Sequence, residues 1–326
     1  FTAEYENLWC EATTLTPEVL EAYTQRTVEY RRLHIEPEHI DQRLVPVPRP
    51  WQTSALNSLD EARNEGLPHA MVAVATGMGK TWLAAFDVRQ LGERVERLPR
   101  VLVIAHRSHI LAQAEAALST VLEAAFRAPI TSWYIGASSK MDGELVLASI
   151  QKLARPSGLA KLTKERFDYV IVDEVHHAHA ATYRRVMARL NTQFVLGLTA
   201  TPERGDGIDV ATIFDGNLAY HATIGDGISE ESLVPFHYIG IRDTVDFEQV
   251  PWRNGRFDVE QLEIQVEQSQ RMDRLWKTMQ QHPAERTIVF CCSKRHALFT
   301  RNWLRERGMS AAAVFSGKGS DPQGVL

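Results

Sequence analysis

Short apolar runs alternate with amphipathic stretches along the middle of this 326-residue chain. The runs are rich in valine, isoleucine and leucine and have the length of buried strands, while the stretches between them repeat apolar residues at helical spacing. The pattern predicts strands at 70–75, 101–105, 144–150, 167–172 and 194–198 and helices at 52–65, 81–91, 110–125 and 182–190. Such alternation is typical of an α/β domain in which helices cover both faces of a parallel sheet.

The regions on either side of this alternation follow other patterns. Residues 1–48 are expected to form a short helical connector that ends in an extended, proline-containing stretch. Residues 226–282 are expected to form a linker, and strand–helix–strand alternation then begins again. The elements expected in these later regions are strands at 235–242, 286–291 and 310–315 and helices at 258–282 and 293–307. We therefore expect a first domain at 49–225 and the start of a second at 283–326.

The composition excludes several classes of protein. Hydrophobic residues make up 44% of the chain and charged residues 24%, as in ordinary globular proteins. No run of about 18 apolar residues is present, so we expect no membrane span and a cytoplasmic location. Cys10, Cys291 and Cys292 are too few for a disulfide framework, and the adjacent pair is expected to be packed. The net charge of −5 disfavours attraction of nucleic acid to the whole surface but allows a basic cleft.

A glycine-containing turn after the first apolar run carries a strong chemical signal. Gly77 and Gly79 let the backbone turn so that its amides can face phosphate oxygens at the start of a helix. In such a loop Lys80 reaches the β and γ phosphates and Thr81 ligates magnesium. The first glycine of the general motif is Val74 here, so a chance Gly-Lys-Thr loop is the alternative. The candidate residues for binding a nucleoside triphosphate are Thr76, Gly77, Met78, Gly79, Lys80 and Thr81.

A pair of carboxylates ends a later apolar run, in the sequence Asp-Glu-Val-His at 173–176. Asp173 at the strand tip can hold magnesium through water, and Glu174 can polarise the water that attacks the γ phosphate. Together with Lys80 these are the candidate catalytic residues, with Thr81 and Asp173 as magnesium ligands. Histidines at 176, 177 and 179 raise the alternative of zinc, but their spacing does not match the helical His-Glu-x-x-His arrangement.

With these motifs in place, the chain resembles superfamily 2 helicases and translocases of the Asp-Glu-x-His type, from about Arg49 to about Phe315. The resemblance implies a RecA-like domain followed by the beginning of a second one, with ATP and Mg²⁺ bound between them. Arg49 and Gln52 match the element that reads adenine. Further matches imply nucleic-acid contacts at His106, Arg107, Ser149 and Gln151, and coupling of hydrolysis to strand binding at His176, Thr199, Ala200 and Thr201.

A finer resemblance is to bacterial restriction and defence helicases with a phospholipase-D-type nuclease domain upstream. It rests on Leu8-Trp9, on Ala85-Phe86-Asp87 and on the stretch 233–238. It implies that DNA is favoured over RNA, and that a nuclease domain or subunit precedes Phe1 in a longer protein with a restriction or phage-defence role. The arginine that completes the ATP site from the second domain has no counterpart in this chain, so residues 1–326 alone are expected to hydrolyse ATP poorly.

Three functions fit these motifs to different extents. The main prediction is an ATP-dependent nucleic-acid helicase or translocase. A nucleotide-gated module that binds nucleic acid and signals to an attached nuclease without unwinding would carry the same motifs. A phosphate-loop enzyme such as a kinase would leave the matches at 106–107 and 199–201 unexplained.

Overall fold

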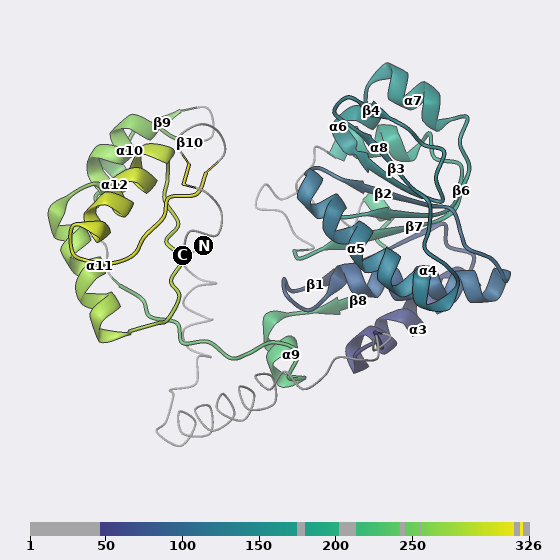
Figure 1. The fold of residues 1–326 in the computed structure, drawn as a ribbon, viewed down its shortest axis with the longest axis horizontal. Coiled ribbons are helices and arrows are strands. Elements are labelled where there is room, and N and C mark those ends of the chain that lie inside the picture. Colours follow the sequence, from purple (N-terminus) through teal and green to yellow (C-terminus); the bar gives the residue numbers. More distant parts are fainter. Residues whose placement is uncertain are drawn as a thin grey trace. The chain divides into compact units, whose positions relative to one another are not determined.

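The computed structural model describes residues 46–174, 180–201, 213–241, 245–253, 256–315 and 320–321. The chain divides into two compact units, of which the first ends at Phe236 and the second begins at His237 (Figure 1). Apart from residues 46–48, the expected N-terminal connector lies outside the described residues. None of the helices in the described ranges is long and apolar enough to cross a lipid bilayer.

The first unit is built from strands and helices that alternate along the chain. Its strands are β1 (His69–Val74), β2 (Val101–Ala105), β3 (Thr131–Ile135), β4 (Ser138–Ser139), β5 (Leu145–Ser149), β6 (Phe167–Val172), β7 (Thr192–Thr199) and β8 (Leu218–Ala222). Its helices are α3 (Pro50–Asn64), α4 (Lys80–Val95), α5 (Ser108–Ala125), α6 (Ile150–Leu153), α7 (Pro156–Leu162), α8 (Ala180–Met187) and α9 (Ile224–Ser229).

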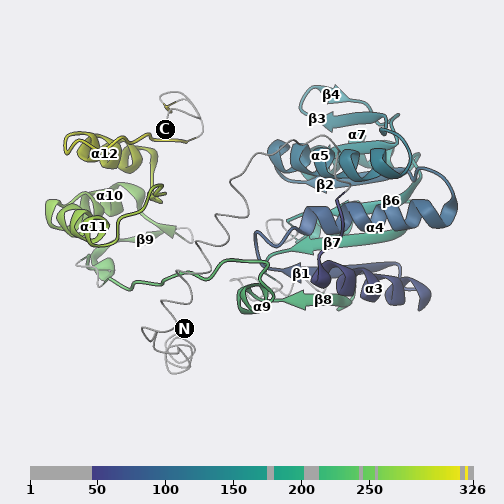
Figure 2. The same cartoon turned by 60° about the horizontal axis from the view of Figure 1, so that its bottom comes forward.

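The eight strands form one sheet in the order β4-β3-β5-β2-β6-β7-β1-β8. All neighbours run parallel except β3 and β4, which are antiparallel. Successive side chains of a strand point to opposite faces, and here each face has its own apolar core. In β2, Val103 packs in the core under α3, α4 and α5, while Leu102 and Ile104 pack in the core under α6, α7 and α8. Figure 2 shows α3, α4 and α5 side by side along the sheet. Burial of both faces explains why the strands read as continuous apolar runs.

The sequence prediction for this unit is confirmed in its main lines. All five expected strands and all four expected helices form, with ends that differ by a few residues. Three strands were not expected: β3, β4 and β8. They lie at the two sides of the sheet, and β3 and β8 are only partly buried, so their sequences lack a continuous apolar run.

The second unit differs more from the prediction. It contains α10 (Val259–Val266), α11 (Ser269–Gln281), α12 (Lys294–Arg305), a 3-10 turn (Phe247–Gln249) and the hairpin strands β9 (Trp252–Arg253) and β10 (Arg256–Phe257). The single helix expected at 258–282 is wrong. Gln268 has extended backbone angles, φ −74° and ψ 137°, and acts as the N-cap of α11, so the helix is interrupted there.

The strands expected at 235–242, 286–291 and 310–315 do not form in the part of the chain that the structure describes. A strand is stable only when a neighbour satisfies its backbone hydrogen bonds. In the second of these segments Ile288 and Phe290 are 81% and 91% exposed. The expected packing of the cysteine pair is wrong for Cys292, which is exposed while Cys291 is half-buried. The start of a second RecA-like domain stays a prediction.

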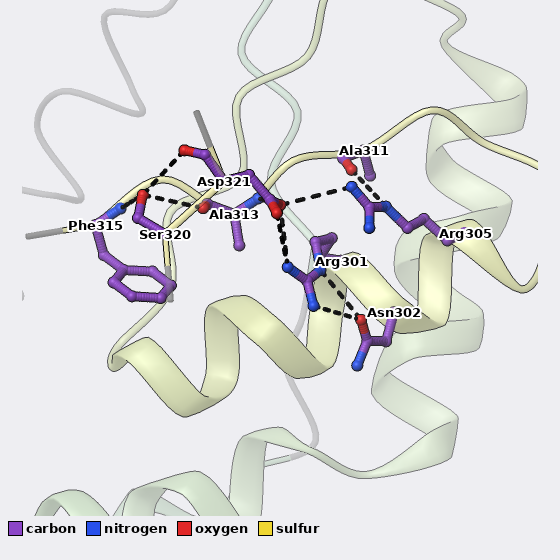
Figure 3. A network of polar contacts seen from close by, with 8 residues as sticks. All are labelled: Arg301, Asn302, Arg305, Ala311, Ala313, Phe315, Ser320 and Asp321. Carbon is purple, nitrogen blue, oxygen red and sulfur yellow. Dashed lines mark hydrogen bonds and ion pairs between the residues drawn. The ribbon is translucent and has the colours of Figure 1, made fainter. Parts of the chain in front are cut away.

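A polar network joins α12 to the end of the described chain (Figure 3). Arg301 donates to both carboxylate oxygens of Asp321 at 3.0 and 3.1 Å, and Arg305 lies 3.6 Å from the same carboxylate. The Asp321 carboxylate also accepts from the backbone amide of Ala313 at 2.8 Å. This amide and the two arginines hold the pKa of Asp321 below its ordinary value. The network therefore fixes residues 320–321 beside residue 313.

Candidate active site

Three of the sequence motifs follow neighbouring parallel strands. The strands β6, β7 and β1 are consecutive in the sheet, and the register pairs Val172 with Gly197 and Ala73 with Thr199. Because their carboxyl ends lie at the same edge, the segments that follow them start at the same level. The phosphate-loop sequence, the acidic pair and the Thr199–Thr201 segment therefore meet at one edge of the sheet.

The loop after β1 has the backbone that its glycines predict. Gly77 and Gly79 have φ angles of 90° and 99°, in the left-handed region that glycine adopts without a steric cost. Gly79 is the N-cap of α4, so the helix begins at Lys80 and its N-terminus faces the loop. Met78 is buried to 1% exposure in the core, so this candidate residue could reach a ligand only through its backbone.

Lys80 is held inside the loop. Its side chain is 9% exposed, and its ammonium group donates to the Val74 carbonyl at 3.1 Å. Burial lowers the pKa of Lys80, and the charges of Glu174 and Asp173 oppose that shift. The three charged candidate residues therefore lie within electrostatic range of one another, as the catalytic hypothesis requires.

Asp173 and Glu174 follow β6 in an unusual backbone conformation. Asp173 is 5% exposed, and its Oδ1 accepts from the Glu174 amide at 2.8 Å. Glu174 has a φ of 55°, a left-handed conformation that costs a residue with a side chain about 1–3 kcal/mol. Such strain is concentrated at functional sites, and nothing in the sequence indicated it.

The charge state of Asp173 depends on its surroundings. Burial, and then the charge of Glu174, raise the pKa of Asp173 to about 6, while Lys80 acts in the opposite direction. A carboxylate that is buried beside another carboxylate is suited to a divalent cation, which would offset both effects. Together with the hydroxyl of Thr81 it offers the hard oxygen ligands that magnesium prefers.

This pKa predicts how the magnesium-free protein responds to pH. The folded value of about 6 lies above the ordinary value of 3.8, so folding favours the protonated carboxyl. Its stabilising contribution is complete below about pH 4 and is lost as the pH rises through about 6. At 1.36 kcal/mol per pKa unit the loss is about 3 kcal/mol. We therefore expect Asp173→Asn to raise the melting temperature in EDTA at pH 8.

The same variant supplies its own control at lower pH. At pH 5 the carboxyl is largely protonated in the folded state but already ionised in the unfolded state, so about half of the loss has occurred, and asparagine should raise the melting temperature about half as much as at pH 8. Thermal unfolding followed by circular dichroism at the two pH values measures this difference. Equal effects at pH 5 and pH 8 would show that the pKa of Asp173 is not raised.

One of the two candidate adenine-reading residues, Gln52, contacts the phosphate loop. Gln52 is 3% exposed, and its side-chain amide donates to the Gly79 carbonyl at 3.1 Å. Its Oε1 accepts from the Arg49 amide at 2.8 Å, which caps the start of α3. The exposed Arg49 side chain donates to the Ser232 carbonyl at 3.4 Å. Gln52 precedes Lys80 by 28 positions in the sequence, and the structure places it against the phosphate loop.

The candidate nucleic-acid contacts meet at the ends of β2 and β5. These strands are neighbours, with Ala105 paired to Ser149, and Gln151 donates to the His106 carbonyl at 3.1 Å. Arg107 and Gln151 are exposed at this edge. Ser149 is 7% exposed and accepts from the Lys152 amide at 3.4 Å as the N-cap of α6. Ser149 therefore has a structural role whether or not it contacts a ligand.

The candidate coupling segment, 199–201, forms a tight turn that two hydrogen bonds close. Thr199 is fully buried, and its hydroxyl donates to the Thr201 carbonyl at 2.8 Å and accepts from the Thr201 amide at 3.2 Å. Ala200 is half-buried and Thr201 is exposed at the site edge. His176, the remaining candidate in this group, lies outside the described residues together with His177 and His179, on which the zinc alternative depended.

A parallel sheet with a phosphate loop after β1 and an acidic pair after β6 defines a RecA-like nucleotide-binding domain. Comparison with known families identifies the class further. Residues 46–204 match the family described as type III restriction enzyme, res subunit. This part of the chain is thus similar to the helicase subunits of restriction enzymes, which confirms the resemblance to superfamily 2 helicases and leaves the link to a phospholipase-D-type nuclease a prediction.

Individual relatives agree with this assignment. The chain is 27% identical over 278 residues to a Schizosaccharomyces pombe protein, irc3, assigned by its name to the mitochondrial ATP-dependent helicases. It is 25% identical over 280 residues to the type I restriction enzyme EcoAI endonuclease subunit of Escherichia coli. These matches cover 82% and 77% of this chain but only 44% and 33% of the relatives. The chain therefore spans less than half the length of either relative.

The UvsW helicase from bacteriophage T4 matches with 16% identity and a TM-score of 0.43, across 68% of this chain and 76% of that one.

Proposed function

We propose that this chain contains the ATP-hydrolysing core of a helicase or translocase that acts on DNA. The observation that carries the proposal is the meeting of Lys80, Asp173 and Glu174 at one edge of the sheet, where the two carboxylates act on the pKa of Lys80, and Glu174 and Lys80 act on the pKa of Asp173. The names of the relatives support ATP as the nucleotide, and that of the EcoAI subunit supports DNA as the partner.

In this proposal each residue of the site has a distinct chemical role. The Lys80 ammonium group leaves the Val74 carbonyl and neutralises charge on the β and γ phosphates. Thr81 and Asp173 would hold magnesium, which would supply further charge neutralisation on the same phosphates. Glu174 orients the attacking water and accepts its proton as the oxygen bonds to the γ phosphorus. The β–γ bridging oxygen leaves with ADP.

Binding of nucleic acid is proposed for the edge formed by β2 and β5. Arg107 offers a positive charge and Gln151 an amide, both exposed, and neither needs a particular base to contact a phosphate. Contacts of this kind give little sequence preference and strong dependence on salt. We infer that the motor moves along the backbone of DNA, so that sequence recognition would be done elsewhere.

The family description and the EcoAI subunit favour a role in restriction or defence. A nuclease domain or subunit that acts with this motor is part of the proposal. That it is of the phospholipase-D type, and that it lies upstream, stays a prediction from the sequence.

The proposal is tested by ATP turnover of the full-length protein with double-stranded DNA, single-stranded DNA, RNA or no nucleic acid. We expect DNA to stimulate turnover, and strand-displacement and translocation assays on the same DNA to report movement. Stimulation without movement would favour the nucleotide-gated binding module instead. No stimulation by any nucleic acid would contradict the proposal.

Arg107 is the first residue to test for the DNA contact. Arg107→Ala removes one phosphate contact, so we expect weaker DNA activation of ATP turnover and a salt dependence of DNA binding that is lower by about one unit of slope. The matched control is Arg127→Ala, which also removes one positive charge. Arg127 pairs with Glu144 just before β5, at the opposite end of that strand from Ser149. Identical slopes in both variants would remove Arg107 from the interface.

A further inference from the structure

A leucine that belongs to none of the candidate ATP-site motifs lies against the phosphate loop. Leu233 is partly buried against the core that also contains Met78. A β-carbon built on Gly77 would lie only 3.2 Å from Cδ2 of Leu233. The Leu233 side chain therefore lies close to the loop backbone, at one of the two glycines that shape the loop, and leaves little room for a side chain there.

The helix α9 completes the contact. A β-carbon built on Gly227 would lie 2.8 Å from Cδ1 of Leu233 and 3.1 Å from Sδ of Met78. The backbone amide of Leu233 donates to the Gly227 carbonyl at 2.8 Å. The side chains of Leu233 and Met78 therefore both lie close to Gly227, and no space for a further carbon is left there.

Hydrogen bonds attach both the start of the phosphate loop and α9 to the strand β8. The strand β8 pairs in parallel with β1, and the amide of Ala75 donates to the Ala222 carbonyl at 3.2 Å, where the loop begins. Directly after β8, a reciprocal capping box between Thr223 and Asp226 starts α9, with hydrogen bonds of 2.7 and 3.2 Å. Figure 1 shows α9 at the end of β8. The helix is thus attached to the strand next to β1.

The chain has no regular secondary structure directly after Leu233. Residues 234–241 form neither helix nor strand, and this segment leads into the second unit. Its apolar side chains are exposed, with Val234 at 65%, Phe236 at 62% and Tyr238 at 69%. Leu233 is therefore the point at which this linker is attached to the first unit.

We propose that Leu233 is a positioning residue of the nucleotide site, which holds the phosphate loop in shape and couples it to the linker at 234–241. The inference rests on the proposed nucleotide-binding function. A displacement of the loop on binding a phosphate moves the surface against which Leu233 packs, and hence the first residues of the linker. By thermodynamic linkage, the linker biases nucleotide affinity to the same extent.

Two glycines of α9 give a matched pair of variants. Gly227→Ala and Gly225→Ala make the same change in the same helix, with the same gain in helix propensity. The new β-carbon at 225 would meet nothing closer than Thr223 Oγ1 at 3.5 Å, whereas at 227 it would press on Leu233 and Met78. In the full-length protein we expect Gly227→Ala to change the dissociation constant of a fluorescent ADP analogue about fivefold or more. Gly225→Ala should stay within about twofold.

Leu233 itself is tested by hydrogen exchange with and without ADP. In the wild type we expect ADP to change the exchange of the 234–241 amides, and Leu233→Ala to remove most of that change. Leu233→Met, which conserves volume, should restore it, and Val234→Ala, at an exposed side chain, should behave as wild type. A role limited to stability would shift the melting temperature without removing the ADP-dependent difference.

The outcomes separate this inference from the proposed function. Equal ADP affinity in the two glycine variants, or no ADP effect on the linker of the wild type, would overturn the role of Leu233 while leaving the nucleotide site intact. Failure of the wild type itself to bind ADP would overturn both.

Discussion

Glu174→Gln is expected to abolish ATP hydrolysis and to leave ATP binding intact. Glutamine has nearly the same size and can adopt the same backbone, but its amide cannot take a proton from the attacking water. Loss of a general base lowers the rate by about 10²–10⁴-fold. The phosphate contacts of Lys80 and of the loop amides do not involve this side chain, so the dissociation constant for ATP should change by less than about threefold. Single-turnover hydrolysis and equilibrium binding on the full-length protein measure the two effects.

A matched control for this variant is a glutamate that lies just before the start of β6, the strand that Asp173 and Glu174 follow. Glu165 precedes β6 and pairs with Arg100 at 2.8 Å, so Glu165→Gln makes the same chemical change away from the site. It should hydrolyse ATP at the wild-type rate. Unimpaired turnover in Glu174→Gln would remove Glu174 from the proposed role, and equal losses in both variants would point to a general effect on the fold.

Asp87→Ala is expected to produce the largest loss of stability in the first unit. Asp87 is fully buried in α4 and accepts two hydrogen bonds from the Arg63 guanidinium, at 2.7 and 2.8 Å, and one from the Tyr169 hydroxyl. Burial alone would lower the pKa of Arg63, but the bonds and charge of Asp87 outweigh it and raise that pKa. Without Asp87 a positive charge is left in a largely buried position. The expected cost is about 3–5 kcal/mol of unfolding free energy.

A second variant separates the charge from the packing. Replacing the pair together, as Arg63→Met with Asp87→Leu, removes both charges and retains most of the volume, so we expect it to recover much of the loss. Glu93→Ala, which breaks the exposed pair between Glu93 and Arg89 in the same helix, should cost about 0.3–0.5 kcal/mol. Urea unfolding measures all three. A loss in Asp87→Ala as small as that in Glu93→Ala would contradict the argument.

This ion pair bears on the active site because of the elements that it joins. Arg63 lies in α3, Asp87 in α4 and Tyr169 in β6. The same three elements carry or lead to Gln52, Lys80 and Asp173. We therefore expect partial disruption of the pair to loosen the relative positions of the nucleotide-binding residues before the unit unfolds.

The central fold could be predicted because its strands are buried on both faces. A run such as 101–105 or 167–172 has no polar residue at a core position, so it can be recognised as a strand from its own residues alone. The site followed from the same property, because chemical residues that directly follow such strands must meet at one edge. No other long-range contact had to be known to predict that Lys80, Asp173 and Glu174 lie close together.

What could not be predicted depends on contacts between distant segments. The aspartate at position 87 stands in an apolar helical stretch, but nothing in the sequence named Arg63 or Tyr169 as its partners. Leu233 has no chemical group to draw attention, and its role depends on the glycines that it touches. The left-handed backbone of Glu174 arises from the turn after β6 and has no sequence signature, since glutamate is not a residue typical of that conformation.

The position of β1 within the sheet has a consequence for how the protein is made. Its neighbours are β7 and β8, which follow it in the sequence by more than 100 residues, with His69 paired to Val195. At a synthesis rate of about 5–20 residues per second, the ribosome takes on the order of ten seconds to deliver these partners. During that interval the apolar segment that forms β1 lacks the two strands to which it hydrogen-bonds in the folded protein. The candidate phosphate loop after β1 is thus among the last parts of the domain to be completed.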